Sequence, residues 1–181
     1  KETECGAVAR ERRKMQKTIY IIGGTMGAGK TTVCQILKKK LPDCVFLDGD
    51  WCWDMDPFQV TEETKTMVLE NVVFLLNRFI RCSAFKNIVF CWVLHEQGII
   101  DGILAKLETE NCRVRSFSLL CGEKELARRL RKDVDSCIRA EDVIARSLAR
   151  IPLYEKLNTV KIDVSRLTPE QAAAEIIRLS G

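Results

Sequence analysis

One segment constrains this chain more than any other: Gly24–Thr31, GTMGAGKT, which fits the pattern G-x-x-x-x-G-K-[S/T]. The apolar, β-branched run Thr18–Ile22 precedes it, and Thr31–Lys40, with apolar residues at helical spacing, follows it. Glycines allow a tight turn whose backbone N–H groups point at phosphate oxygens, and a helix N-terminus adds partial positive charge. The segment therefore predicts a strand, a phosphate-binding loop and a helix in succession, rather than a chance match on a glycine turn.

The residue types of this loop have distinct expected roles. Lys30 is expected to reach the β- and γ-phosphates, the Thr31 hydroxyl to ligate Mg²⁺, and Thr32 to flank the α-phosphate. The remaining phosphate contacts are expected from Gly24, Met26, Gly27, Ala28 and Gly29. The motif predicts nucleotide binding, and by itself it does not choose between a kinase, an ATPase and a switch GTPase.

Short β-rich runs alternate with longer helical runs along the rest of the chain. Further strands are expected at 44–47, 87–94, 113–120 and 160–164. Further helices are expected at 62–83, 97–108, 123–132, 141–157 (disturbed by Pro152) and from Thr168, with Pro169 in its first turn and a capping box to Gln171. This alternation predicts an α/β fold, with a parallel sheet covered by helices on both faces. We expect one domain at 15–181, after an N-terminal extension or cloning remnant at 1–14.

Composition narrows the function classes. Among 181 residues, 29 Lys plus Arg against 25 Asp plus Glu give a net charge of +4, too small to indicate general nucleic-acid binding. No apolar stretch approaches the ~20 residues that span a bilayer, and no signal peptide is visible. The nine cysteines show no paired C-x-x-C spacing, which favours thiols in a reducing compartment over a zinc site or a disulfide framework. We therefore predict a cytoplasmic protein with no nucleic-acid or membrane partner.

Two carboxylates, Asp48 and Asp50, follow the second expected strand, at the sheet edge where parallel sheets bind ligands. Two residues apart on an extended chain, their side chains are expected to point the same way. One carboxylate can hold Mg²⁺ while the other accepts a proton from an attacking hydroxyl. Asp50 is the first candidate for the base, and Asp48 is the second candidate and the metal ligand. A simple turn at Asp48-Gly49 is the alternative.

Aromatic residues follow this pair directly: Trp51, Trp53 and Phe58, interleaved with Asp54 and Asp56. Aromatic side chains beside a catalytic carboxylate can stack on a flat ring or a sugar face. They can equally form the packed start of a helical subdomain, and the sequence leaves both interpretations open.

Four cations lie within Arg128–Lys132, near the end of an expected helix and before the polar segment 133–140. A lid at this place would bring arginines over the nucleotide, neutralise charge on the γ-phosphate and exclude water. We expect Arg131 and Arg139 to have that role and Arg128 to stack on the nucleobase of the bound nucleotide. A solvated face that complements the helix dipole is the alternative. The single histidine, His95, is a candidate for acceptor contact or for a structural role.

Together, Gly24–Thr31, Leu47–Asp50 and the arginine-rich helix with its lid resemble the small P-loop kinases. That group includes shikimate, gluconate and adenylylsulfate kinases and chloramphenicol phosphotransferase-like proteins, and the Leu-Asp-Gly-Asp segment is particularly similar to adenylylsulfate kinase. The resemblance implies the P-loop nucleoside triphosphate hydrolase fold, a three-layer sandwich with a five-stranded parallel sheet and a helical lid. It also implies ATP, Mg²⁺ and transfer of the γ-phosphoryl group to a small acceptor.

The chain departs from these relatives at the acceptor side. Trp51-Cys52-Trp53 stands where adenylylsulfate kinase carries an arginine, and 94–98 replaces the glycine-rich segment of shikimate kinases. The predicted function is therefore a kinase for a hydroxyl compound: a nucleoside or nucleotide, a sugar acid or an antibiotic. The alternative is a nucleotide-driven ATPase or switch protein that acts on a protein partner, although N-K-x-D and D-x-x-G motifs are absent. A monomer or a homodimer is expected.

Overall fold

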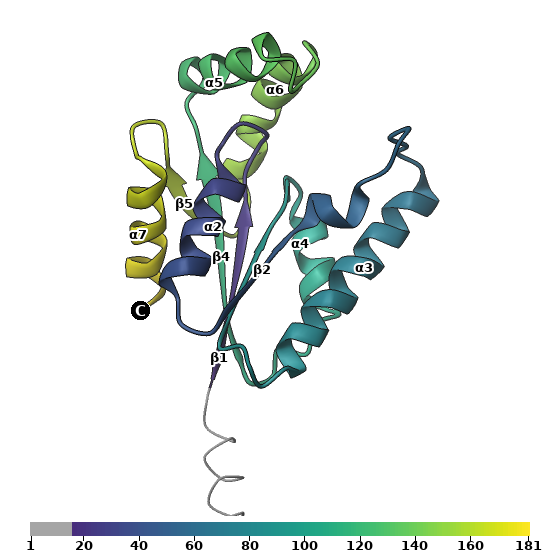
Figure 1. Cartoon of the computed structure of the whole chain (residues 1–181), viewed down its shortest axis with the longest axis vertical. Helices are drawn as coiled ribbons and strands as arrows, with labels where there is room; N and C mark the ends of the chain where they lie inside the picture. The colour runs from purple at the N-terminus through teal and green to yellow at the C-terminus, as the bar shows by residue number, and fades with distance from the viewer. Residues whose placement is uncertain (1–15) are drawn as a thin grey trace, which may run out of the picture.

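The computed structural model describes residues 16–181 (Figure 1). The extension expected at 1–14 lies outside the described residues. The strands are β1 (Lys17–Gly23), β2 (Cys44–Asp48), β3 (Asn87–Cys91), β4 (Cys112–Leu120) and β5 (Val160–Asp163). The helices are α2 (Lys30–Lys40), the 3-10 helix η2 (Gly49–Trp53), α3 (Glu62–Arg81), α4 (Gln97–Leu104), α5 (Glu123–Asp135), α6 (Val143–Glu155) and α7 (Pro169–Ser180).

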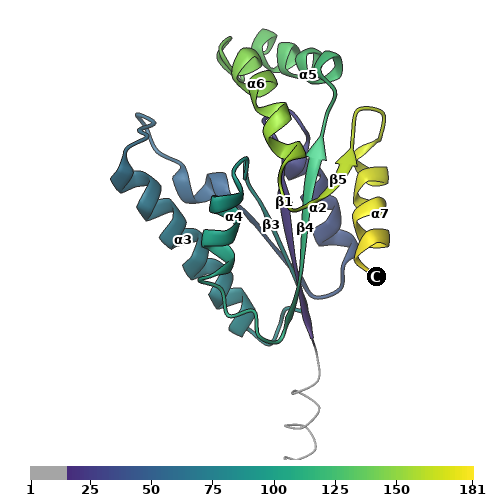
Figure 2. The same cartoon turned by 180° about the vertical axis from the view of Figure 1, so that it is seen from behind.

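All strand pairs are parallel, in the order β2-β3-β1-β4-β5. The central strand is β1, whose Ile21 pairs with Phe90 of β3 and with Ser116 of β4. Because parallel strands end at the same edge, the segments after β1, β2 and β3 meet there. Helices α2 and α7 cover one face and α3 and α4 the other, while α5 and α6 lie beyond the carboxyl edge (Figures 1 and 2). The predicted α/β sandwich with a five-stranded parallel sheet is confirmed.

A hydrophobic core lies on each face of the sheet. Alternate residues of β1 supply them: Tyr20 and Ile22 join the cluster with α2 and α7, and Ile19 and Ile21 the cluster with α3 and α4. A strand buried on both faces has a continuous apolar run, which is why Thr18–Ile22 was readable from sequence.

Some element ends differ from those expected. The third strand ends at Cys91, before the end expected at 94, and Leu94 itself has φ of 44°, a left-handed conformation that no strand can include. Beyond the strand, Val93 O accepts a hydrogen bond from the Gly24 amide at 3.3 Å. Pro152 lies inside α6, and the capping box between Thr168 and Gln171 opens α7 as predicted.

A helix that crosses a bilayer needs about 20 consecutive, predominantly apolar residues. None of those in residues 16–181 is both long and apolar enough to cross a membrane.

Candidate active site

The loop between β1 and α2 has the backbone expected of a phosphate cradle. Gly27 and Gly29 have φ of 80° and 88°, which glycine adopts without strain. No side chain caps α2, so the N–H groups of its first turn are available to an anion. A Cβ built on Gly27 would lie 2.8 Å from Leu130 Cδ2 of α5, so the loop and the helix above it fit closely only with glycine there. These features fit the phosphates of a nucleotide.

Lys30 begins α2, and its Nζ donates to Thr25 O at 3.2 Å. Burial lowers the pKa of this ammonium group, and the acidic groups of Cys91, Asp50 and Asp48 raise it in part. A bound phosphate would stabilise the charged form further. Lys30 thus begins the helix that follows the loop, close enough to Asp48 and Asp50 for both carboxyl groups to act on its pKa.

Thr31 and Asp48 form a pair: Thr31 Oγ1 donates to Asp48 Oδ2 at 2.7 Å. Asp48 is almost fully buried, at 4% exposure, and its Oδ1 accepts from the Asp50 amide at 3.2 Å. This second bond makes Asp48 the N-cap of η2. The expectation that Asp48 and Asp50 sit on an extended chain is therefore wrong, because the strand ends at Asp48 and Asp50 belongs to a 3-10 turn.

Asp50 is exposed as a residue, and Trp92 Nε1 donates to its Oδ1 at 3.1 Å. Desolvation of the carboxyl group raises the pKa of Asp50, as does the neighbouring Asp48. Lys30, the hydrogen bond from Trp92 and Arg139 oppose that rise. A raised pKa brings a carboxylate closer to that of an effective general base.

Trp92, which the sequence analysis did not select, supports this carboxylate. Gly49 lies directly on its indole, since a Cβ at Gly49 would be 2.5 Å from Trp92 Cγ. In the sequence, Trp92 lies inside the strand expected at 87–94, where an aromatic residue gives no signal of a site. Two further rings follow: Trp53 lies 6.2 Å from Trp92 and 5.3 Å from Phe58, between ring centroids. Trp53 is thus a packed residue, whereas Trp51 and Phe58 are 56% and 63% exposed.

The segment made of α5, α6 and their connection, 136–142, is called the lid here. The arginines selected from sequence lie on it in ion pairs with lid carboxylates: Arg128 with Glu125 at 2.7 Å, Arg131 with Glu141 at 2.6 Å and Arg139 with Asp133 at 3.1 Å. Arg139 is also close enough to Asp50 to lower its pKa. Exposed pairs of this kind are worth little, so their partners can exchange at small cost.

Helix α6 fastens the lid to the sheet edge. Thr25 Oγ1 donates to Ser147 O at 3.2 Å, and Tyr154 OH donates to Val93 O at 2.6 Å. Arg150, on the same face of α6, lowers the pKa of His95, whose burial has the larger lowering effect. His95 Nε2 lies 3.3 Å from Glu96 Oε1, and its Nδ1 is buried with no hydrogen-bond partner among the described residues. These contacts between distant segments were not readable from sequence.

Comparisons with known proteins agree with this geometry. A family model described as "AAA domain" matches residues 21–148. Similar solved structures include the tunicamycin resistance protein of Deinococcus radiodurans, at 17% identity and TM-score 0.67, with 92% of this chain and 96% of that chain covered. A gluconokinase from Sinorhizobium meliloti 1021 has 17% identity and TM-score 0.63, with 93% and 95% covered. Shikimate kinase from Acinetobacter baumannii, solved with shikimate, has 20% identity and TM-score 0.61, with 93% and 95% covered.

No curated protein sequence matches the chain. At these identities the solved structures establish the fold, the P-loop nucleoside triphosphate hydrolase fold shared with small P-loop kinases.

Proposed function

We propose that this chain, which belongs to the AAA domain family, transfers the γ-phosphoryl group of ATP to a hydroxyl group of a small molecule. One observation carries the proposal. The Asp50 carboxylate accepts a hydrogen bond from Trp92, whereas the Asp48 carboxylate is bonded to Thr31, so the site offers both a phosphate cradle and a second carboxylate. A kinase uses such a carboxylate to accept the proton of the acceptor hydroxyl group.

In this proposal the loop backbone and Lys30 hold the ATP phosphates. Thr31 and Asp48 supply the hydroxyl and carboxylate oxygens for Mg²⁺, which favours oxygen ligands and usually takes one or two carboxylates with the rest from water and phosphate. The pair fits that donor set, with the two oxygens 2.7 Å apart. When bound, Mg²⁺ neutralises charge on the β- and γ-phosphates.

Asp50 is the proposed general base. As the acceptor oxygen forms a bond to the γ-phosphorus, its proton passes to the Asp50 carboxylate. The bond from that phosphorus to the β–γ bridging oxygen breaks, and its electron pair leaves with ADP. Arg139 and Arg131 would exchange their lid carboxylates for the transferring phosphoryl group. Arg128 is proposed to contact the nucleobase of ATP. Candidate acceptors are a nucleoside or nucleotide, a sugar acid and an antibiotic.

The test measures ADP formation from ATP and Mg²⁺, alone and with a panel of hydroxyl compounds. We expect ADP formation to depend on the acceptor, with a phosphorylated product in equal amount. Lys30→Ala should fold normally and lose at least about tenfold in rate, about 1.4 kcal/mol of transition-state stabilisation. Equal ADP formation without any acceptor would instead support an ATPase that acts on a protein partner.

A further inference from the structure

An exposed aromatic surface begins at the proposed base. It consists of Trp53 and Phe58, and Trp92 connects it to Asp50. Trp92 touches the Asp50 carboxylate, Trp53 is the next ring, tilted at 59° to Trp92, and Phe58 follows, tilted at 46° to Trp53. The rings therefore extend in an unbroken series from the carboxylate to solvent.

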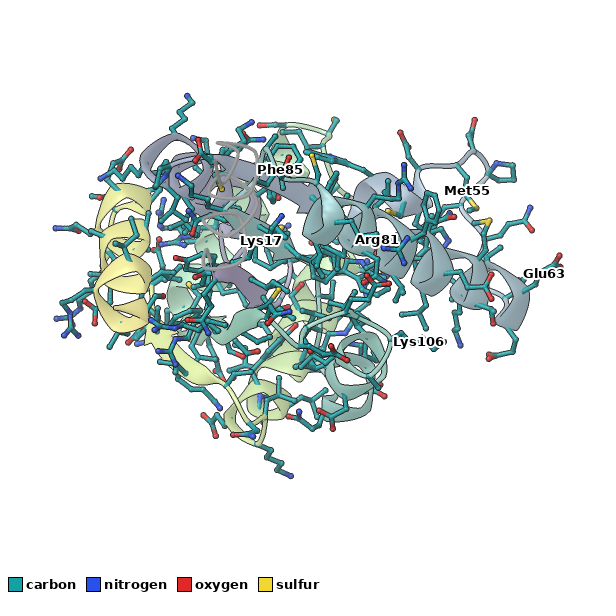
Figure 3. The ribbon with its side chains drawn as sticks, turned by 90° about the horizontal axis from the view of Figure 1, so that it is seen from below. Lys17, Met55, Glu63, Arg81, Phe85 and Lys106 are labelled. Atoms are coloured by element: carbon teal, nitrogen blue, oxygen red, sulfur yellow. The ribbon has the colours of Figure 1, made fainter. Side chains whose placement is uncertain are left out.

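The outer end of this surface leaves much of its area in water. Phe58, at the outer end, is 63% exposed, while Trp53 lies 6.2 Å from Trp92 between ring centroids. Single exposed apolar residues are ordinary on a protein surface. Several aromatic residues beside the proposed base are less ordinary, because each of them gains most from contact with another flat ring. The segment that bears them stands away from the body of the molecule, as the positions of Met55 and Glu63 show (Figure 3).

The charge of this segment limits what can bind there. Residues 42–64 contain no Lys, Arg or His. Asp54 and Asp56, next to the rings, are both exposed. A phosphate or carboxylate on the acceptor would meet charge of the same sign and no cation from this segment.

We propose, resting on the phosphotransferase function above, that the acceptor is a ring-bearing alcohol without phosphate or carboxylate. Its ring stacks on the aromatic surface of Trp53 and Phe58 while its hydroxyl group reaches Asp50. Nucleosides fit this description, whereas nucleotides and sugar acids carry the anionic groups that it excludes. The rings select the substrate, and the neighbouring carboxylates of Asp54 and Asp56 repel anions.

The first experiment compares acceptors that differ in one property. Phosphorylation of uridine and guanosine is measured beside that of their 3′- and 5′-monophosphates, ribose and gluconate. We expect kcat/KM for a nucleoside to exceed that for ribose, which lacks the ring, and for both monophosphates by at least tenfold.

The second experiment uses two matched phenylalanines. Phe58→Ala should raise KM for the nucleoside roughly tenfold or more, the usual effect of losing a stacked ring, and change kcat less. Phe74 on α3 is 64% exposed, as much as Phe58, and lies outside the aromatic surface, so Phe74→Ala should leave KM unchanged. Binding of ATP–Mg²⁺, followed by calorimetry, should be the same in both variants.

The outcomes separate the two proposals. Phosphorylation of gluconate or a nucleotide in preference to nucleosides would overturn the acceptor class and leave the phosphotransferase in place. The same holds if Phe58→Ala and Phe74→Ala have equal KM for the nucleoside. If no compound in this panel is phosphorylated while ATP still binds, the acceptor class is overturned, and the wider panel of hydroxyl compounds described above decides the phosphotransferase proposal.

Discussion

At the scale of single residues, the site depends on how differently two neighbouring aspartates are held. Asp48 is buried, accepts a hydrogen bond from Thr31 and caps the turn that follows. Asp50 is on that turn, bonded to Trp92, with a pKa raised by desolvation and by Asp48. A buried, well-bonded carboxylate suits a metal, and a carboxylate with a raised pKa suits proton transfer.

Replacing each aspartate tests this assignment. Asp50→Asn should lower the rate of transfer by roughly 10²–10⁴-fold, the usual effect of a positioned general base, and leave ATP–Mg²⁺ binding intact. Asp48→Asn should weaken the response to Mg²⁺, with part of the loss recovered at higher Mg²⁺. Rates and metal titrations on both variants give the answer. Full activity in both would mean that the pair only shapes a turn.

Trp92→Phe probes the bond that holds the base. The indole N–H favours the charged carboxylate and so lowers the pKa of Asp50. Without it the pKa should rise further, and a base works only when deprotonated. The rate should therefore begin to fall at a higher pH in Trp92→Phe than in the parent as the solution is acidified. A pH profile of kcat that is identical in the two proteins would show that this bond does not act on Asp50.

At the scale of secondary-structure elements, the lid and the phosphate loop are fitted to each other. Gly27 is enclosed by Leu130 and Leu126 of α5, and Thr25 bonds to α6 through Ser147. The lid therefore rests directly on the loop that is proposed to hold the phosphates.

The two glycines of the loop separate backbone strain from packing. Gly27 and Gly29 both have positive φ, but a Cβ on Gly29 would meet nothing within 4 Å. Both alanine variants should lose about 1–2 kcal/mol of unfolding free energy from backbone strain. Gly27→Ala should lose a further ~1–3 kcal/mol from overpacking against Leu130. Urea unfolding of both variants measures the difference, and equal losses would mean that the lid yields without cost.

Most elements could be predicted from the sequence, since their apolar period and caps are local signals. The glycine loop gave the positions of β1 and α2, and the pattern at Thr168–Gln171 gave the start of α7. A turn at Asp48-Gly49 was left open as the alternative, but the 3-10 helix Gly49–Trp53 was not predicted. The support of Gly49 on Trp92 comes from a residue distant in sequence and could not be read locally.

At the scale of the whole molecule, the two hydrophobic cores share one sheet, and we propose that 15–181 fold as a unit. Distance along the chain limited the prediction of the site at this scale. The loop and the aspartates had a recognisable pattern, whereas α6 reaches the site only through tertiary contacts such as that of Tyr154 with Val93.

The cysteines give a prediction for the chain as a whole. The eight described cysteines are all free, and of them only Cys137 is exposed. Burial raises the pKa of the Cys44 thiol to about 12, which slows its reaction near neutral pH. Thiol titration of the native protein at pH 8 should therefore lose one fast-reacting group in Cys137→Ser. Unfolded protein kept under reducing conditions should titrate all nine thiols, as the predicted cytoplasmic location requires, and a bridge that resists mild reductant would contradict it.

The ring series beside Asp50 has an optical consequence. The chain has three tryptophans: Trp53 and Trp92 belong to that series, and Trp51, which packs on Phe46, directly follows Asp50 in the sequence. Nearly all of the protein's intrinsic fluorescence excited at the red edge of its absorption band must therefore come from one neighbourhood of the fold. The emission of the unlabelled chain is in effect a local probe of the acceptor side, silent about α7 and the far end of the sheet.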